Sequence, residues 1–307
     1  MRSTALTYIL DAMIDAFLRG EDWDEAPELM AFQAPFGAIL DEAAAIVAVL
    51  ADPSAAAVFA NSTSGANEAT AAAALRLYIL VPALVNVILN YKICVEHGLP
   101  LHPTVYYELA EARRYKMDHP IADLDRANRL YLASIELARA AYRLEGDFGE
   151  RAAAFKAQLP EEIAHFVYTS GRDKYSWRGA EPAKLAALSE KVGLSYCPAL
   201  IVAAAHGSIM PGLLLAEYIG RPIYFVRFSM FKRKDEAPIL SVSDEVWLSS
   251  WREKSVLLFD EDVAMGTTLE LFYRRLAPLF AEAKSACSIR YAGSSFAPDF
   301  VAQFWWD

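Results

Sequence analysis

Cysteine is scarce in this sequence, and its spacing excludes the structures that cysteine usually stabilises. The 307 residues contain three cysteines, Cys94, Cys197 and Cys287. Their number is odd, they lie far apart and no CxxC pair is present, which argues against a disulfide framework and against a zinc site. Such cysteine usage is typical of a reducing compartment, so we predict a cytoplasmic location.

An excess of positive charge is also missing. The chain has 29 Lys and Arg against 39 Asp and Glu, a net charge of -10 and a pI near 5.1. Because duplex nucleic acid is bound mainly through cationic side chains, we do not expect it as a partner. No HExxH spacing and no GxxxxGK[ST] phosphate loop occur, so the scattered histidines His97, His102, His119 and His165 are interpreted as structural.

Uninterrupted apolar runs of membrane length are lacking as well. Residues 1–19 carry Asp11, Asp15 and Arg19 instead of a continuous apolar stretch, so no secretion signal is expected. The most apolar run, residues 75–95, contains polar groups that would be costly inside a bilayer, among them Asn90 and Lys92. We predict that this run is a buried helix of a soluble bundle and that the protein has no membrane partner.

The chain changes character near residue 175. At 55% hydrophobic residues it is long enough to bury a large core and to hold two domains. Before residue 175 the apolar residues follow a helical period, which predicts helices at about 3–19, 24–32, 36–51, 66–96, 103–115, 121–145, 147–157 and 160–168. We therefore predict an all-helical domain over residues 1–175. A lid, a platform for a homodimer and a partner-binding module are all compatible with it.

After residue 175 strands alternate with helices. The pattern predicts strands at 199–205, 223–228, 256–259 and 287–292, weaker strands at 239–242 and 245–249, and helices at about 181–192, 211–219 and 267–282. This alternation is typical of an α/β domain, here residues 176–307, with a mainly parallel sheet wrapped by helices. Ligands of such sheets bind beyond the carboxyl ends of the strands.

The most informative segment is residues 256–270. Four apolar residues run into the carboxylates Asp260, Glu261 and Asp262, and Gly266, Thr267 and Thr268 then open an apolar-periodic helix. Carboxylates at a strand end can hold hydroxyls or a metal, and the N-terminus of the helix offers N–H groups to an anion. The segment therefore suits a sugar phosphate.

This segment resembles the ribose-phosphate signature of the type I phosphoribosyltransferases. Its acidic pair, Asp260 and Glu261, would bind ribose hydroxyls, and the stretch Ala264, Met265, Gly266, Thr267 and Thr268 would cradle the 5-phosphate. The sequence departs from the family at Asp262, which is usually apolar, and at Ala264 and Met265, which replace hydroxyl residues. A cradle that loses side-chain hydroxyls keeps its backbone N–H groups.

Further pieces follow in the order of that family. The loop His206, Gly207 and Ser208 falls where the family contacts pyrophosphate, and a basic stretch after the next strand holds Arg227, Lys232, Arg233 and Lys234. Near the end of the chain, Pro298-Asp299 and the aromatics Trp305 and Trp306 resemble the base-binding segment of the purine-salvage branch. The resemblance spans about residues 180–307.

The resemblance implies transfer of ribose 5-phosphate from phosphoribosyl pyrophosphate to a nitrogenous base or similar acceptor, with release of pyrophosphate. Mg²⁺ is the implied cofactor; it would reach the protein with the substrate and would need no cage of protein ligands beyond Asp260 and Glu261. A non-catalytic regulator that senses nucleotides or phosphoribosyl pyrophosphate is the main alternative. A haloacid-dehalogenase-type phosphatase, with Asp260 as nucleophile and Asp262 as acid/base, is a further one, although its motif wants Thr or Val where Ala264 stands.

Overall fold

Six consecutive apolar residues form strand β3 (Leu200–Ala205), and all six are buried. A continuous apolar run is typical of a parallel strand that is covered on both faces. In the computed structural model this strand belongs to a five-stranded sheet of order β4-β3-β5-β6-β7, in which every neighbouring pair is parallel. The other strands are β4 (Ile223–Arg227), β5 (Ser255–Val263), β6 (Glu282–Arg290) and β7 (Phe300–Phe304). The structure describes residues 13–52 and 65–305, without the side chains of residues 65–67, 231 and 232.

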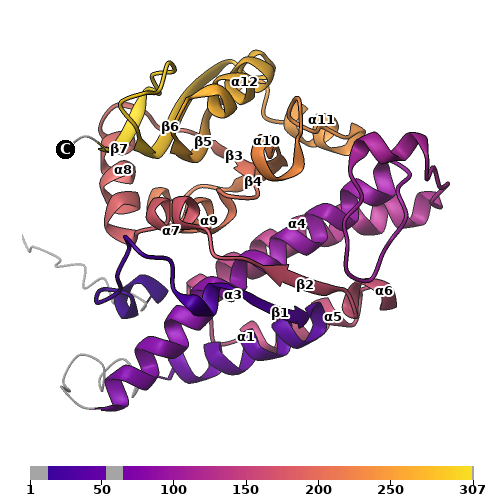
Figure 1. The fold of residues 1–307 in the computed structure, drawn as a ribbon, viewed down its shortest axis with the longest axis horizontal. Helices are drawn as coiled ribbons and strands as arrows, with labels where there is room; N and C mark the ends of the chain where they lie inside the picture. Colours follow the sequence, from indigo (N-terminus) through magenta and orange to yellow (C-terminus); the bar gives the residue numbers. More distant parts are fainter. Residues whose placement is uncertain (1–12, 53–64, 306–307) are drawn as a thin grey trace, which may run out of the picture.

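Helices cover both faces of this sheet. On one face, α7 (Lys174–Gly179), α8 (Pro182–Ser195) and α9 (Ile209–Ile219) lie between the sheet and the helical half of the chain (Figure 1). On the other face, α12 (Thr267–Leu276) packs on β5 and is followed by the short helix η4 (Ala277–Leu279). The short helix α10 (Met230–Arg233) follows β4, and α11 (Val242–Ser249) lies beyond it.

The N-terminal half is mainly helical. Its long helices α3 (Gly65–Glu96) and α4 (Ile121–Tyr142) pack on each other and on α9 of the sheet half, so both halves contribute to one buried core. The shorter elements are α1 (Phe36–Leu50), α5 (Phe148–Lys156), α6 (Glu161–Ala164), η1 (Ile14–Phe17), η2 (Glu28–Met30) and η3 (Leu109–Arg113). A two-stranded antiparallel ribbon joins β1 (Phe32–Pro35) to β2 (Val167–Ser170).

Helix α3 contains the most apolar run of the sequence, residues 75–95. By length and composition it could cross a membrane, but 72% of its most apolar window is buried inside the protein. Lys92 on this helix is fully buried and forms ion pairs with Glu96 and with Asp244 of α11. Lysine is rarely fully buried unless it is paired, and these ion pairs allow Lys92 to lie in a helix of the protein core, which is the role predicted for this segment.

The α/β fold class and the helical N-terminal region are confirmed, whereas several predicted elements were wrong. Residues 24–32 form η2 and the start of β1 instead of a helix, residues 103–115 are helical only in η3, and residues 160–168 divide between α6 and β2. Of the predicted helix 3–19, residues 1–12 lie outside the described residues and the remainder forms only η1.

In the sheet half, the weak strand predicted at 245–249 is part of helix α11. Ser241 caps this helix and forms a capping box with Asp244, a pattern that the sequence displays. The weak strand at 239–242 is reduced to a single bridge between Ile239 and Arg227. Helix α12 ends at Leu276, six residues before the predicted end, and strand β7 was not predicted.

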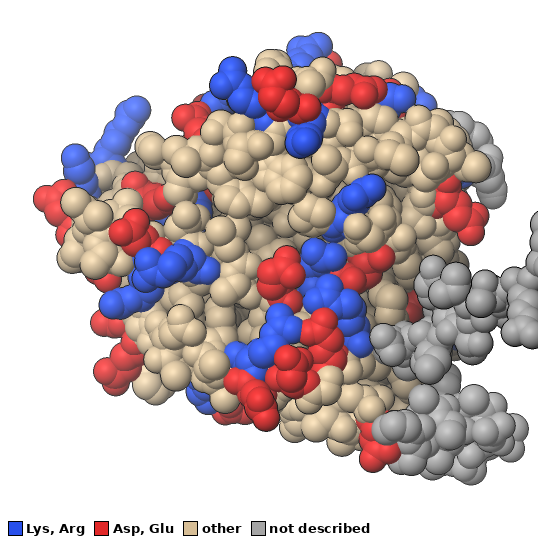
Figure 2. Space-filling view, turned by 180° about the vertical axis from the view of Figure 1, so that it is seen from behind, with Lys and Arg blue, Asp and Glu red and all other residues tan. Residues whose placement is uncertain are grey.

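Charges on the face seen in Figure 2 are mixed. Lys and Arg side chains lie next to Asp and Glu side chains across the middle of this face. This agrees with ion-pair networks such as the one in which Arg139 and Arg143 both bind Glu217.

Candidate functional site

Strand β5 carries the acidic residues to the carboxyl edge of the sheet. It is longer than the predicted 256–259, because its pairing with β6 continues through Asp260 and Asp262 to Val263. Asp260 is buried at 6% exposure, whereas Glu261 and Asp262 are half-buried. The three carboxylates therefore lie within the end of a central strand, where ligands of parallel sheets bind.

The loop after β3 meets these acids through Ser208. Ser208 Oγ lies 3.0 Å from Asp260 Oδ1 and 2.6 Å from Glu261 Oε2, and it accepts a hydrogen bond from Glu261 N at 3.1 Å. Since a hydroxyl has one proton, it donates to one of the two carboxylates at a time. His206 and Gly207, half-buried, complete this loop. The structure thus brings the predicted pyrophosphate loop and the acidic pair into direct contact.

Glu261 is enclosed by small residues. A Cβ added to Gly207 would lie 1.7 Å from Glu261 Oε1, and one added to Gly179 of α7 would lie 3.0 Å from Glu261 Cβ. Ser176, also on α7, places its Oγ 3.4 Å from Glu261 Oε1. The contacts of α7 were not predicted. The sequence could have indicated the helix through its cap, Asp173, but Ser176 lies 85 residues from Glu261, and this separation hides the contact.

Burial and a neighbouring negative charge hold protons on Asp260 and Asp262. Burial, followed by the charge of Glu261, raises the pKa of Asp260 well above its usual range. The same two causes raise the pKa of Asp262 from 3.8 to about 7. A bound cation would favour the ionised carboxylates, so the site suits a ligand that brings positive charge.

Asp262→Asn is expected to change the pH dependence of stability. Because the folded state holds a proton on Asp262 between about pH 4 and 7 and the unfolded state does not, wild-type stability falls as pH rises through this window. The variant lacks this loss, so it should be more stable than wild type at pH 8 by up to about 4 kcal/mol, and much less so at pH 4. Urea unfolding at both pH values measures this, and equal pH slopes for the two proteins would contradict it.

The predicted phosphate cradle forms the turn between β5 and α12. Gly266 has φ +90° and caps α12, and a Cβ at this position would lie 2.7 Å from Ser294 Oγ and 2.8 Å from Phe296 N. Only glycine adopts this conformation readily, and only glycine fits against the 294–296 loop. Met265 O accepts hydrogen bonds from Ser295 N and Oγ at 3.1 and 3.2 Å.

The outer side of this turn faces solvent. Ala264, Met265 and Thr267 are exposed, and Thr268 is half-buried with its Oγ1 3.6 Å from Met230 Sδ. The first N–H groups of an α-helix have no acceptor within the helix. The turn therefore presents backbone donors beside the acidic strand end, at the same sheet edge as Ser208.

The basic stretch does not form the solvent-facing loop that its composition predicts. Residues 230–233 form helix α10, and Arg227 is buried at the end of β4, where it binds Asp235 and Glu108. Arg233 binds Glu108 as well. Lys234 is exposed, and the side chain of Lys232 lies outside the described part of the chain.

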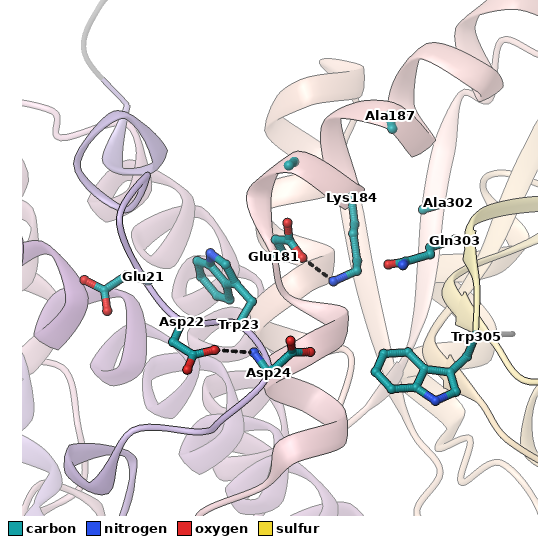
Figure 3. Close-up of a pocket in the computed structure, with 11 residues that line it drawn as sticks. Glu21, Asp22, Trp23, Asp24, Glu181, Lys184, Ala187, Ala302, Gln303 and Trp305 are labelled. Carbon is teal, nitrogen blue, oxygen red and sulfur yellow. Dashed lines mark hydrogen bonds and ion pairs between the residues drawn. The ribbon is translucent and has the colours of Figure 1, made fainter. Parts of the chain in front are cut away.

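A cavity of about 610 Å³ lies beside the carboxyl end of β7 (Figure 3). Its walls come from residues 21–24, from the N-terminal turns of α8 and from Trp305, and Figure 3 shows Trp305 across the opening from Trp23 and Asp24. Arg178 connects this cavity to α7: its guanidinium lies 4.6 Å from the centre of the Trp305 ring and 3.7 Å from Asp24 Oδ1. Trp306 lies outside the described residues.

Comparisons with known proteins give structural likenesses only. No protein-family model matches the chain, and no curated protein sequence matches it significantly. A purine phosphoribosyltransferase from Pyrococcus horikoshii is similar at 25% identity and a TM-score of 0.34, over 41% of this chain and 82% of that one. A hypothetical protein from Neisseria gonorrhoeae with bound ppGpp is similar at 20% identity and a TM-score of 0.35, over 40% of this chain and 78% of that one. The xanthine-guanine-hypoxanthine phosphoribosyltransferase of Helicobacter pylori is similar at 17% identity and a TM-score of 0.29, over 40% of this chain and 85% of that one.

Proposed function

We propose that this protein binds phosphoribosyl pyrophosphate and transfers its ribose 5-phosphate to a nitrogen acceptor. One observation carries the proposal: the acids of β5, the Ser208 loop and the Gly266 turn meet at one sheet edge. Each group suits one part of the substrate. Carboxylates bind hydroxyls, a glycine loop admits an anion closely, and a helix N-terminus binds a phosphate.

Each part of the substrate contacts a different set of residues. Asp260 and Glu261 hold the ribose hydroxyls, the amides of the 264–268 turn hold the 5-phosphate, and residues 206–208 face the pyrophosphate. During transfer the bond between ribose C1 and pyrophosphate breaks, and a bond between C1 and the acceptor nitrogen forms. Positive charge then develops on the ribose and negative charge on the pyrophosphate, so positioning and electrostatics are the main contributions of the protein.

The donors at this edge fit a hard cation. Carboxylate oxygens are the ligands that Mg²⁺ prefers, and Asp262 Oδ2 is a buried carboxylate oxygen at this edge beside Tyr291. The described residues contain no group of three His, Cys, Asp or Glu side chains that could hold a metal, so Mg²⁺ would arrive with the substrate, neutralise pyrophosphate charge and meet Asp260 and Glu261.

We place the acceptor in the cavity between residues 21–24, α8 and Trp305. Its volume of about 610 Å³ is that of a small-molecule site, and Trp305 offers a flat apolar surface. Arg178 and α7 join this cavity to Glu261, because Arg178 contacts Trp305 while Ser176 contacts Glu261. The acceptor would therefore approach from the side formed by both halves of the chain.

A sensor without turnover is the second candidate, and the turn at residues 264–268 favours it. Ala264 and Met265 supply no hydroxyl to a phosphate. A phosphatase is disfavoured because Ala264 stands where its motif requires Thr or Val.

Isothermal titration with phosphoribosyl pyrophosphate in Mg²⁺, combined with a pyrophosphate-release assay over a panel of purine and pyrimidine bases, tests the proposal. Saturable binding with release of pyrophosphate is expected for at least one base. Binding without release across the panel would favour the sensor. No binding at millimolar ligand would remove both candidates.

Gly207→Ala is expected to weaken this binding by about tenfold or more, while the protein stays folded. The added Cβ would overlap Glu261 Oε1, which lies at the end of a flexible side chain and can move away. The moved carboxylate would leave Ser208 and the ribose hydroxyls, and a tenfold loss corresponds to about 1.4 kcal/mol. Gly293→Ala is the matched control, because a Cβ there meets nothing within 4 Å. Equal affinities for the two variants would count against Glu261 as a ligand.

A further inference from the structure

Glu108 of the helical half binds both arginines of the basic stretch. Its Oε1 lies 2.8 Å from Arg233 Nη1, and its Oε2 accepts a hydrogen bond from Arg227 Nη2. Asp235 also accepts hydrogen bonds from Arg227, from Nη2 at 3.0 Å and from Nε at 3.3 Å. Two carboxylates thus neutralise two guanidinium groups.

The four residues are not equally buried. The side chains of Arg227 and Asp235 are 1% and 5% exposed, whereas those of Arg233 and Glu108 are 21% and 33% exposed. Glu108 is therefore the outermost member and covers Arg227. Nη1 of Arg227 is also buried and has no hydrogen-bond partner among the described residues, so this guanidinium retains an unused donor.

The position of Arg227 connects this cluster to the proposed pyrophosphate loop. Arg227 is paired in register with Ala205, the last residue of β3, and Phe228 N donates to Ala205 O at 2.8 Å. The loop 206–208 begins at the next residue. The backbone of Arg227 thus lies beside the start of the loop where an anion is expected, and Glu108 occupies the guanidinium groups of Arg227 and Arg233.

Local hydrogen bonds hold the segment that carries Glu108, and the ring of Tyr106 also stacks on Phe166 with the ring centres 4.5 Å apart. Glu108 caps the short helix η3 and exchanges hydrogen bonds with Glu111 three residues later. Tyr106, two residues earlier, lies with its ring centre 5.2 Å from the Arg233 guanidinium. The contacts of this segment with Arg233 are thus those that a competing anion would break.

We propose that Glu108 is an internal competitor of the leaving-group anion: pyrophosphate, free or within phosphoribosyl pyrophosphate, displaces the Glu108 carboxylate from Arg227 and Arg233 and releases the segment around η3. The inference rests on the proposed function, since it uses the same anion. Through Glu108, the helical half would regulate access of the anion to the site. A pair of guanidinium groups binds a diphosphate through the same kind of charge-assisted hydrogen bonds as a carboxylate. The diphosphate carries more negative charge and more acceptor oxygens than the carboxylate.

Glu108→Gln tests this directly. The variant removes the competing charge and should bind inorganic pyrophosphate and phosphoribosyl pyrophosphate, each with Mg²⁺, about tenfold more tightly than wild type in isothermal titration. Glu253→Gln removes the same charge from an exposed site remote from the cluster and should leave both affinities unchanged. A purely structural ion pair would predict lower stability of the Glu108 variant with no gain in affinity.

The outcomes separate the two proposals. Wild-type binding with equal or weaker binding by Glu108→Gln would overturn the competitor while the proposed function stands. Absence of binding by both proteins would overturn both, and binding by the variant alone would support both.

Hydrogen exchange of the wild-type protein gives a second test that needs no variant. Phosphoribosyl pyrophosphate with Mg²⁺ should increase exchange at residues 105–113 and decrease it at residues 264–268. Protection of both segments would contradict displacement of Glu108.

Discussion

Lys92→Met is expected to destabilise the folded protein by about 3–5 kcal/mol. Lys92 Nζ is fully buried and lies 2.8 Å from Glu96 Oε2, 2.7 Å from Asp244 Oδ1 and 2.8 Å from Ser241 Oγ. Methionine keeps the length of the side chain but leaves two buried carboxylates without their cation. The loss of one partner of a buried pair costs more than the pair itself contributes, because the remaining charge stays desolvated.

Urea unfolding of Lys92→Met and Lys156→Met measures this effect. Lys156 also pairs with a carboxylate, that of Asp41, but both side chains are more than a third exposed. The control should therefore lose less than about 1 kcal/mol. Similar losses for the two variants would contradict the assigned cost of removing the buried cation between α3 and α11.

The Asp260→Asn/Glu261→Gln double change is expected to weaken binding of phosphoribosyl pyrophosphate about 100-fold. Both amides keep the shape of the side chains, but they remove the charge that attracts Mg²⁺ and the strong acceptors for ribose hydroxyls. Folding should not suffer, because burial raises the pKa of Asp260 and its neutral replacement avoids that cost. A large loss of affinity at unchanged or higher stability is therefore specific to the site.

The matched control for this variant is Glu245→Gln/Glu253→Gln, which removes two charges from exposed side chains. Isothermal titration should give wild-type affinity for the control. Wild-type affinity for the Asp260/Glu261 variant would remove the assigned ribose contacts.

The sequence predicted the sheet half well because its signals are local. The buried run of β3 and the change from apolar residues to acids in β5 depend on neighbouring residues alone. The end of β5 was predicted too early, since carboxylates usually stop a buried strand; here the ladder between Asp260 and Cys287 continues it. Helix α11 was missed because its alternating residues resemble a strand, although the Ser241–Asp244 capping box indicates a helix.

The remainder of the site depends on contacts between distant residues. Ser176 lies 85 positions from Glu261, and Glu108 lies 119 positions from Arg227. Each is a common residue in an ordinary local context, so no periodicity or motif marks it. The basic stretch shows the same limit: its composition indicates a solvated loop, whereas Glu108 and Asp235 allow Arg227 to be buried.

We propose that the end of β5 and the N-terminus of α12 form one ribose-phosphate site. A crystal structure of the protein with phosphoribosyl pyrophosphate and Mg²⁺ tests it most directly. We expect the 5-phosphate within hydrogen-bond distance of the backbone N–H groups of residues 265–268, and the ribose hydroxyls against Asp260 and Glu261. Ligand bound only in another place, such as the cavity beside Trp305, with the 264–268 turn unaltered and free of phosphate, would contradict the claim.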